Sequence, residues 1–155
     1  MKRFFIFVGV MLFASASVAS DKDLKEFIWT NKASFHKSSS KTISPVIDSL
    51  LELNSGGTEK FLLRWLNKEL WFRKSDGLVV TAKKLEKKSY KIFDVIDEQL
   101  IEVIDKKKIK QIKPNSGVRA IISSALVQFQ LLNADPSIRS KTLDSIARKP
   151  EERFR

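Results

Sequence analysis

Cysteine is absent from this chain of 155 residues, and histidine occurs once, as His36. Without cysteine there are no disulfide bonds and no thiol chemistry, so a folded domain depends on its apolar core. The motifs of serine hydrolases and zinc proteases are missing too. His36 lies in the polar, serine-rich stretch 34–44 with no second ligand nearby, so we expect it on the surface. The sequence therefore favours a protein that is not an enzyme and binds no cofactor or metal.

Long apolar runs are also scarce, and the clearest one is at the N-terminus. Residues 1–20 combine two basic residues at the start, an apolar run over 4–13 and a tail of small residues. These regions are typical of a secretory signal peptide, with cleavage after Ala19 or Ser20. The run is shorter than the roughly 20 residues of a membrane span, although an uncleaved anchor stays open as an alternative. We expect a periplasmic or secreted protein.

Acidic residues are few relative to basic ones: the chain has 18 aspartates and glutamates and 29 lysines and arginines, which gives a formal net charge of +11. Removing Lys2 and Arg3 with the leader leaves +9. One interpretation is a solvated lysine-rich surface that keeps the protein soluble; the other is attraction to an acidic partner or weak contact with an anionic membrane surface. No basic motif interleaved with aromatic residues occurs, so nucleic acid is not an expected partner.

Two pairs of helices are predicted, one on each side of the middle of the chain. In the first pair, Ser44-Pro45 begins a helix, 54–57 interrupts it, and a second helix follows to about residue 69. In the second pair, apolar residues recur at steps of three and four, which places them on one face. This stripe consists of Val118, Ile121, Ile122, Ala125, Phe129 and Leu132. Phe129, in its middle, is expected in the core.

The pattern between the two pairs is that of strands. The β-prone runs 70–72 and 78–81 are separated by Arg73-Lys-Ser-Asp-Gly77, in which Asp-Gly is a strong hairpin signal. The stretch 90–112 fits either a helix or strands, and its many β-branched residues favour strands. We therefore predict an α+β fold that is mostly helical, with helical hairpins flanking a small antiparallel sheet.

The predicted organisation is a signal peptide (1–20), a short helix and polar linker (21–43), one helical domain (44–149) with a β insert at about 70–112, and a tail (150–155).

Five carboxylates between the predicted strands are a candidate site, because paired carboxylates can transfer protons or hold a hard cation. They are Asp94, Asp97, Glu98, Glu102 and Asp105. Their spacing matches no calcium loop and lysines follow at 106–108, so we interpret them as solvated turn charges. Trp65 and Trp71 are expected in the core.

Three stretches together resemble a known family. Asp135-Pro136, Ile138 and Arg139, followed by a helix, resemble one unit of a HEAT-like helical repeat. With 70–80 and 115–119, this junction looks like the extracytoplasmic N-terminal region of urea-type ABC transporter permeases, in the branched-chain amino acid transporter group. The resemblance covers roughly 44–148. The membrane-spanning permease portion of that family has no counterpart here, so a split accessory subunit and a truncated permease both fit.

The resemblance implies an accessory interaction domain that contacts the transporter permease or its solute-binding protein. Its motifs supply the candidate contact or structural residues Arg73, Lys74, Asp76, Gly77, Arg119, Asp135, Pro136 and Arg139. For the two arginines at helix starts, 119 and 139, an internal cap or ion pair is the favoured role. The alternatives are an unrelated periplasmic small-ligand binder or enzyme with a pocket between helices and sheet, and a periplasmic interaction or stress protein unrelated to transport.

Overall fold

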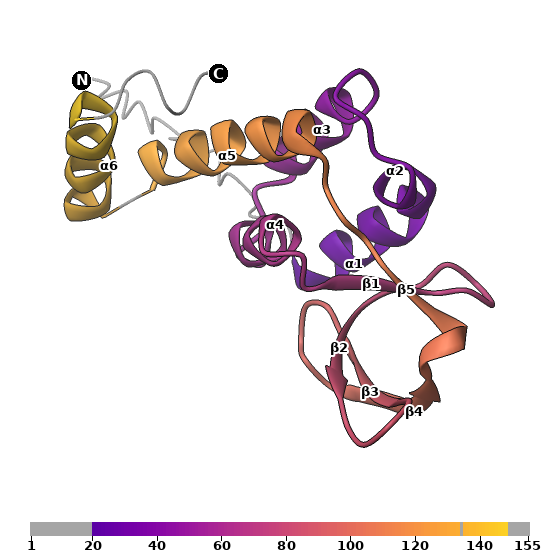
Figure 1. Cartoon of the computed structure of the whole chain (residues 1–155). Helices are drawn as coiled ribbons and strands as arrows, with labels where there is room; N and C mark the ends of the chain where they lie inside the picture. Colours follow the sequence, from indigo (N-terminus) through magenta and orange to yellow (C-terminus); the bar gives the residue numbers. More distant parts are fainter. Residues whose placement is uncertain (1–19, 134, 149–155) are drawn as a thin grey trace, which may run out of the picture.

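The computed structural model describes residues 20–133 and 135–148, which contain six α-helices and a five-stranded antiparallel sheet. The chain forms four helices, then the sheet, then two more helices. Figure 1 shows the sheet at one end of the molecule and α6 at the other. The predicted α+β class is confirmed. The expected leader up to residue 19 and the tail from residue 150 lie outside the described residues.

The first four helices begin and end at local signals. They are α1 (Asp21–Thr30), α2 (Lys32–His36), α3 (Ser44–Leu53) and α4 (Thr58–Leu66). Ser20 caps α1, since its side chain accepts a hydrogen bond from the Asp23 backbone while the Asp23 carboxylate accepts from Ser20. Pro45 lies in the first turn of α3, and Asn54 ends that helix in the left-handed conformation at φ 46°.

Two residues of the stretch interpreted as a polar linker belong to the core, whereas its lysines are exposed as expected. The side chains of Phe35 and Ile43 are both fully buried. The Phe35 ring packs edge-on against Phe61 and Trp65, with ring centroids 5.3 and 5.2 Å apart. Two apolar anchors thus hold a serine-rich segment in place. The expected core position of Trp65 is confirmed.

The middle of the chain forms the predicted antiparallel sheet. Its strands are β1 (Leu70–Arg73), β2 (Val79–Lys84), β3 (Ser89–Asp94), β4 (Leu100–Asp105) and β5 (Ile109–Gln111), with the 3-10 turn η1 (Lys106–Lys108) before β5. The strand order is β4-β3-β2-β1-β5. Figure 1 shows these strands curling around a common centre. Strands rather than a helix are therefore confirmed for the ambiguous stretch 90–112.

Alternate residues of the sheet belong to two apolar cores. Leu70 and Val79 pack with the helices in the main core, whereas Val80 and Ile92 belong to a second, smaller core. Trp71 packs against this smaller core and lies 5.5 Å from the Tyr90 ring, centroid to centroid. Its side chain is half-buried, so the expectation that Trp71 is a core residue is met only in part.

The last two helices are α5 (Ser116–Leu131) and α6 (Pro136–Arg148). The α5 helix packs on α3 and α4 and buries Val118, Ile122, Ala125 and Leu126. The core position expected for Phe129 is wrong, because this side chain is only half-buried. Figure 1 shows α6 turned steeply away from α5. Within the described chain, no helix combines the length and the apolar character needed to cross a bilayer.

Candidate functional site

The junction between α5 and α6 is built as the sequence predicts. The Asp135 carboxylate accepts a hydrogen bond from the Ser137 backbone at 2.8 Å, and Pro136 is the first residue of α6. This hydrogen bonding lowers the pKa of Asp135 below its usual range. The Arg139 guanidinium donates to the Asn133 carbonyl at 2.8 Å, which ties the first turn of α6 to the end of α5. Asp135, Pro136 and Arg139 therefore hold the junction together.

Large apolar side chains are exposed at this end of the molecule. Leu132 is 85% exposed, Leu143 is 57% exposed and Ile138 is 36% exposed. Within α6, Thr142 is the one buried residue, and its hydroxyl donates to the Ile138 carbonyl at 2.8 Å. The α6 helix thus covers little of its own apolar surface against the rest of the chain. We call Leu132, Ile138 and Leu143 the apolar end.

A hollow of about 670 Å³ lies beside the apolar end. Its walls come from the turn between α3 and α4 and from the last turns of α5. Leu51, Gly56, Phe129 and Leu132 supply its apolar part. Phe129 therefore lines a surface hollow, because the burial of α5 ends at Leu126 and the helix continues to Leu131. Sequence periodicity placed Phe129 on the correct face of α5 but could not show where that cover ends.

The hairpin between β1 and β2 contains four of the predicted site residues. The Arg73 guanidinium meets the Asp76 carboxylate through two nitrogens, at 3.0 and 2.6 Å, and Glu102 on β4 through a third, at 2.5 Å. This pairing lowers the pKa of Asp76 to about 2. Gly77 has φ +77°, so the predicted positive φ is confirmed. Arg73 and Asp76 thus brace the hairpin, while the Lys74 side chain is exposed.

His36 contradicts the expectation of a surface residue. Its ring stacks on Phe72 with centroids 4.0 Å apart and an interplanar angle of 16°. Its Nε2 is buried and has no hydrogen-bond partner. Burial lowers the pKa of His36, although a hydrogen bond with the Gly77 backbone opposes that shift. Composition around His36 pointed to a solvated loop, and only its tertiary contacts with the hairpin make it structural.

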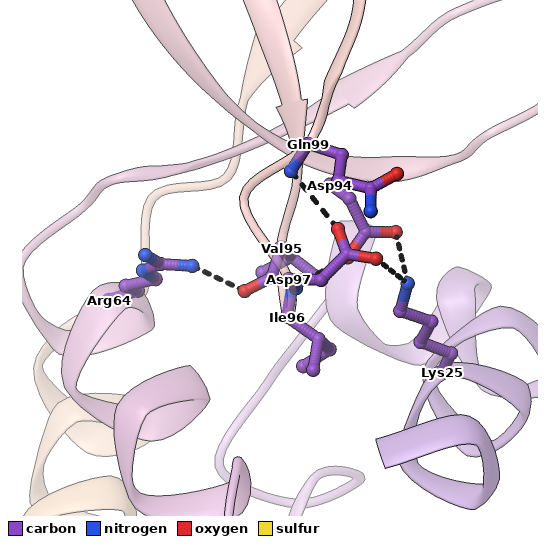
Figure 2. Close-up of polar contacts among 7 residues, drawn as sticks. All are labelled: Lys25, Arg64, Asp94, Val95, Ile96, Asp97 and Gln99. Atoms are coloured by element: carbon purple, nitrogen blue, oxygen red, sulfur yellow. Dashed lines mark hydrogen bonds and ion pairs between the residues drawn. The ribbon is translucent and has the colours of Figure 1, made fainter.

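The carboxylates between β3 and β4 fasten the sheet to the helices, which corrects their interpretation as solvated turn charges. Lys25 on α1 meets Asp97 at 2.6 Å and Asp94 at 3.2 Å, as Figure 2 shows. The same figure shows Arg64 on α4 donating to the Val95 carbonyl. Hydrogen bonding to Lys25 lowers the pKa of Asp97.

Two more of these carboxylates have distant cationic partners. Glu98 pairs with Lys60 and Arg64 on α4, which lowers its pKa, and Glu102 pairs with Arg73. Asp105 instead caps η1, because its side chain accepts from the Lys107 backbone at 2.7 Å. Val95 and Ile96, in the turn between β3 and β4, are buried in the main core. The whole β3–β4 turn is therefore a docking element. In the part of the chain that is described, no group of three or more His, Cys, Asp or Glu side chains is placed to hold a metal ion.

Arg119 is the remaining predicted site residue. It lies exposed in the first turn of α5, where Asn115, rather than Arg119, provides the cap by accepting from the Val118 backbone at 2.9 Å. Arg119 takes part in none of the ion pairs among the described residues. Among the residues that the structure describes, Arg119 thus forms neither the cap nor the ion pair expected for it.

A second hollow of about 570 Å³ lies between α4 and the sheet. Aromatic rings and charged side chains of both signs line it: Trp71 and Phe93, the basic Arg64, Lys68 and Lys83, and the acidic Glu69 and Glu98. This is the region where the alternative hypothesis expected a ligand pocket. Arg64 already donates hydrogen bonds to Glu98 and to the Val95 carbonyl. Lys68 and Lys83 are therefore the cations of this hollow that could meet a ligand.

Function is inferred from these surfaces. Comparison of the chain with protein-family models, with curated proteins and with solved structures finds no match.

Proposed function

We propose that the chain is a non-catalytic, exported interaction domain that contacts a protein partner through its apolar end. The observation that carries this proposal is the exposure of Leu132 and Leu143 at the end where α6 buries only Thr142. Large apolar side chains that stay exposed add nothing to the stability of an isolated chain, so we take these residues as candidates for contact with a partner. The neighbouring hollow, with Phe129 and Leu51 in its wall, gives a partner side chain a place to insert.

The proposed partner is a urea-type ABC transporter, through its permease or its solute-binding protein. The support is the resemblance of the α5–α6 junction, with Asp135-Pro136 and Arg139, to the extracytoplasmic region of such permeases. A HEAT-like helical unit cannot bury its apolar faces alone and stacks on a neighbouring unit. A transporter component that acts as this neighbour would cover Leu132 and Leu143. A split accessory subunit and the remnant of a permease would use the same surface.

Site-specific photo-crosslinking in cells that express the transporter tests this proposal. A photoreactive residue at Leu143 is expected to give a product that contains the permease or the solute-binding protein. The matched control is Lys87, which is exposed on the hairpin between β2 and β3. The same product from both positions, or a product made of two copies of this chain, would overturn the proposal. The Leu132→Asp/Leu143→Asp variant should keep its melting temperature and lose the product, because both side chains are exposed.

A small-ligand binder is the second candidate, because the hollow between α4 and the sheet combines Trp71 and Phe93 with Lys68 and Lys83. The part of the hollow around these rings and lysines suits a small anionic molecule with a flat ring. Of its two glutamates, Glu98 is already paired with Lys60 and Arg64, and Glu69 lies at the wall. NMR spectra recorded with a set of aromatic carboxylates separate the two candidates. Shifts that cluster at Trp71 and disappear in Trp71→Ala would favour the ligand binder, whereas spectra that stay unchanged would exclude this class of ligand.

A further inference from the structure

Seven lysines lie on two adjoining segments of the sheet. Two are the last residues of β2, two follow in the turn to β3, and three form η1. They are Lys83, Lys84, Lys87, Lys88, Lys106, Lys107 and Lys108, and all seven are exposed. The two segments adjoin because Ser89 pairs with Asp105 in the sheet, and because the Lys106 backbone donates to the Lys88 carbonyl at 2.8 Å. We call this group the lysine end.

Among the described residues, no ion pair neutralises the positive charge of the lysine end. None of its seven lysines takes part in the ion pairs of the described residues, which involve Lys25, Lys60, Arg64 and Arg73. Two carboxylates, Glu86 and Asp105, belong to the same segments, and Asp105 is already oriented toward the η1 backbone. Lys25 and Lys60 serve the fold through ion pairs, whereas these seven concentrate positive charge on two adjoining segments.

The hairpin also presents one large apolar side chain. Leu85 is 42% exposed between Lys84 and Glu86 at the turn. The turn is held by backbone hydrogen bonds from Leu85 to Ser89 at 2.9 Å and from Ser89 to Glu86 at 3.0 Å. An apolar residue at the tip of a fixed, lysine-rich hairpin can enter the boundary between lipid headgroups and acyl chains. The long lysine side chains then keep their ammonium groups among the headgroups.

We propose that the lysine end docks on an anionic lipid surface, with Leu85 as its apolar contact. All seven cations are lysines, and attraction to a charged bilayer needs no fixed donor geometry, whereas recognition of single carboxylates on a polypeptide favours the arginine fork. Figure 1 shows the sheet and α6 at opposite ends of the molecule, so lipid contact leaves the apolar end free for a protein partner. The inference does not depend on what that protein is.

Vesicle flotation with the full chain tests the proposal. Binding to vesicles of phosphatidylcholine with about one third phosphatidylglycerol should exceed binding to pure phosphatidylcholine at least tenfold, since each lysine near such a surface adds roughly fivefold. Raising NaCl from 0.05 to 0.3 M should remove most of the difference. Equal binding to both vesicle types would overturn the proposal. Because Lys2 and Arg3 would also favour anionic lipid, the variants below separate the lysine end from any binding by the leader.

A matched pair of variants distinguishes binding by the lysine end from binding that depends only on the net charge of the chain. Lys84→Glu/Lys87→Glu/Lys88→Glu should lose at least tenfold in binding to the anionic vesicles. The control is Lys37→Glu/Lys41→Glu/Lys141→Glu, which changes the charge equally at exposed positions outside the lysine end and should retain binding. Equal losses in the two variants would overturn the proposal, because diffuse charge would then suffice. Thermal melts of both variants check that they fold.

Leu85 distinguishes a lipid surface from an acidic polypeptide. Leu85→Gln should weaken vesicle binding severalfold and leave its salt dependence unchanged, because the lost contact is apolar. Poly-glutamate added in equal charge should compete weakly. If Leu85→Gln binds vesicles as tightly as the wild type and poly-glutamate competes efficiently, the lysine end binds an acidic polypeptide and the lipid proposal is overturned.

Discussion

Replacing His36 with alanine should destabilise the protein, because this side chain joins α2 to the hairpin between β1 and β2. The stacked contact with Phe72, at 4.0 Å between centroids, is expected to contribute about 0.5 to 1.5 kcal/mol beyond the area it buries. Loss of the half-buried ring adds a few tenths more, so we expect a loss of about 1 to 2 kcal/mol in the free energy of unfolding. At roughly 3 to 5 °C per kcal/mol, the melting temperature should fall by several degrees.

The pH dependence of stability gives an independent measure of the same contact. Burial lowers the pKa of His36 in the folded state, so the unfolded chain binds a proton more readily, from about pH 6.5 downward. The stabilising effect of neutral His36 is therefore present above pH 6.5 and is lost as the pH falls below it. His36→Phe should keep the stack on Phe72 and lose this pH dependence. Because His36 is the one histidine, the interval between pH 5 and 7 isolates its titration from that of other side chains.

Urea unfolding of the full chain at pH 7.5 and 5.5 measures both effects. The neighbouring exposed residue Lys37 supplies the control, and Lys37→Ala should unfold as the wild type does. Identical midpoints for wild type, His36→Ala and His36→Phe at both pH values would refute the reasoning. The contact between α2 and the hairpin would then be unimportant for stability.

Three further predictions follow from the geometry. Gly77→Val should lower the free energy of unfolding by about 2 to 3 kcal/mol, since φ is +77° there. Gly56→Val should lower it much less, because no atom lies within 4 Å of a Cβ at that position. Equal losses for the two variants in denaturant unfolding would contradict this prediction. In the same assay, Ile122→Ala should lower the free energy of unfolding by about 2 to 4 kcal/mol and Phe129→Ala by about 1 kcal/mol, because only Ile122 of the two is fully buried. The reverse order would argue against the assigned core. If the leader is removed on export, as we propose, mass spectrometry of the mature protein should find its N-terminus at Ser20, whose side chain caps α1; a first residue at 21 would rule this out.

Local signals in the sequence predicted much of the fold. Asp135 and Pro136 start α6, Pro45 lies in the first turn of α3, and Gly77 takes the positive φ that its hairpin needs. These features depend on the bonding or conformational freedom of one residue and its close neighbours, so they are readable without tertiary information. The antiparallel sheet over 70–112 follows from the density of β-branched residues in the same way.

Tertiary structure decided which of the predicted faces are covered and which charges are paired. Periodicity placed Phe129 and Ile122 on one stripe of α5, yet only Ile122 has helices packed over it. Asp97 finds its cation 72 residues away, on Lys25, and no spacing rule reports a partner at that distance. His36 and Phe35 are held by side chains that meet them only after folding. Periodicity records the direction in which a side chain points, whereas its burial and its partners depend on segments that are remote in the chain.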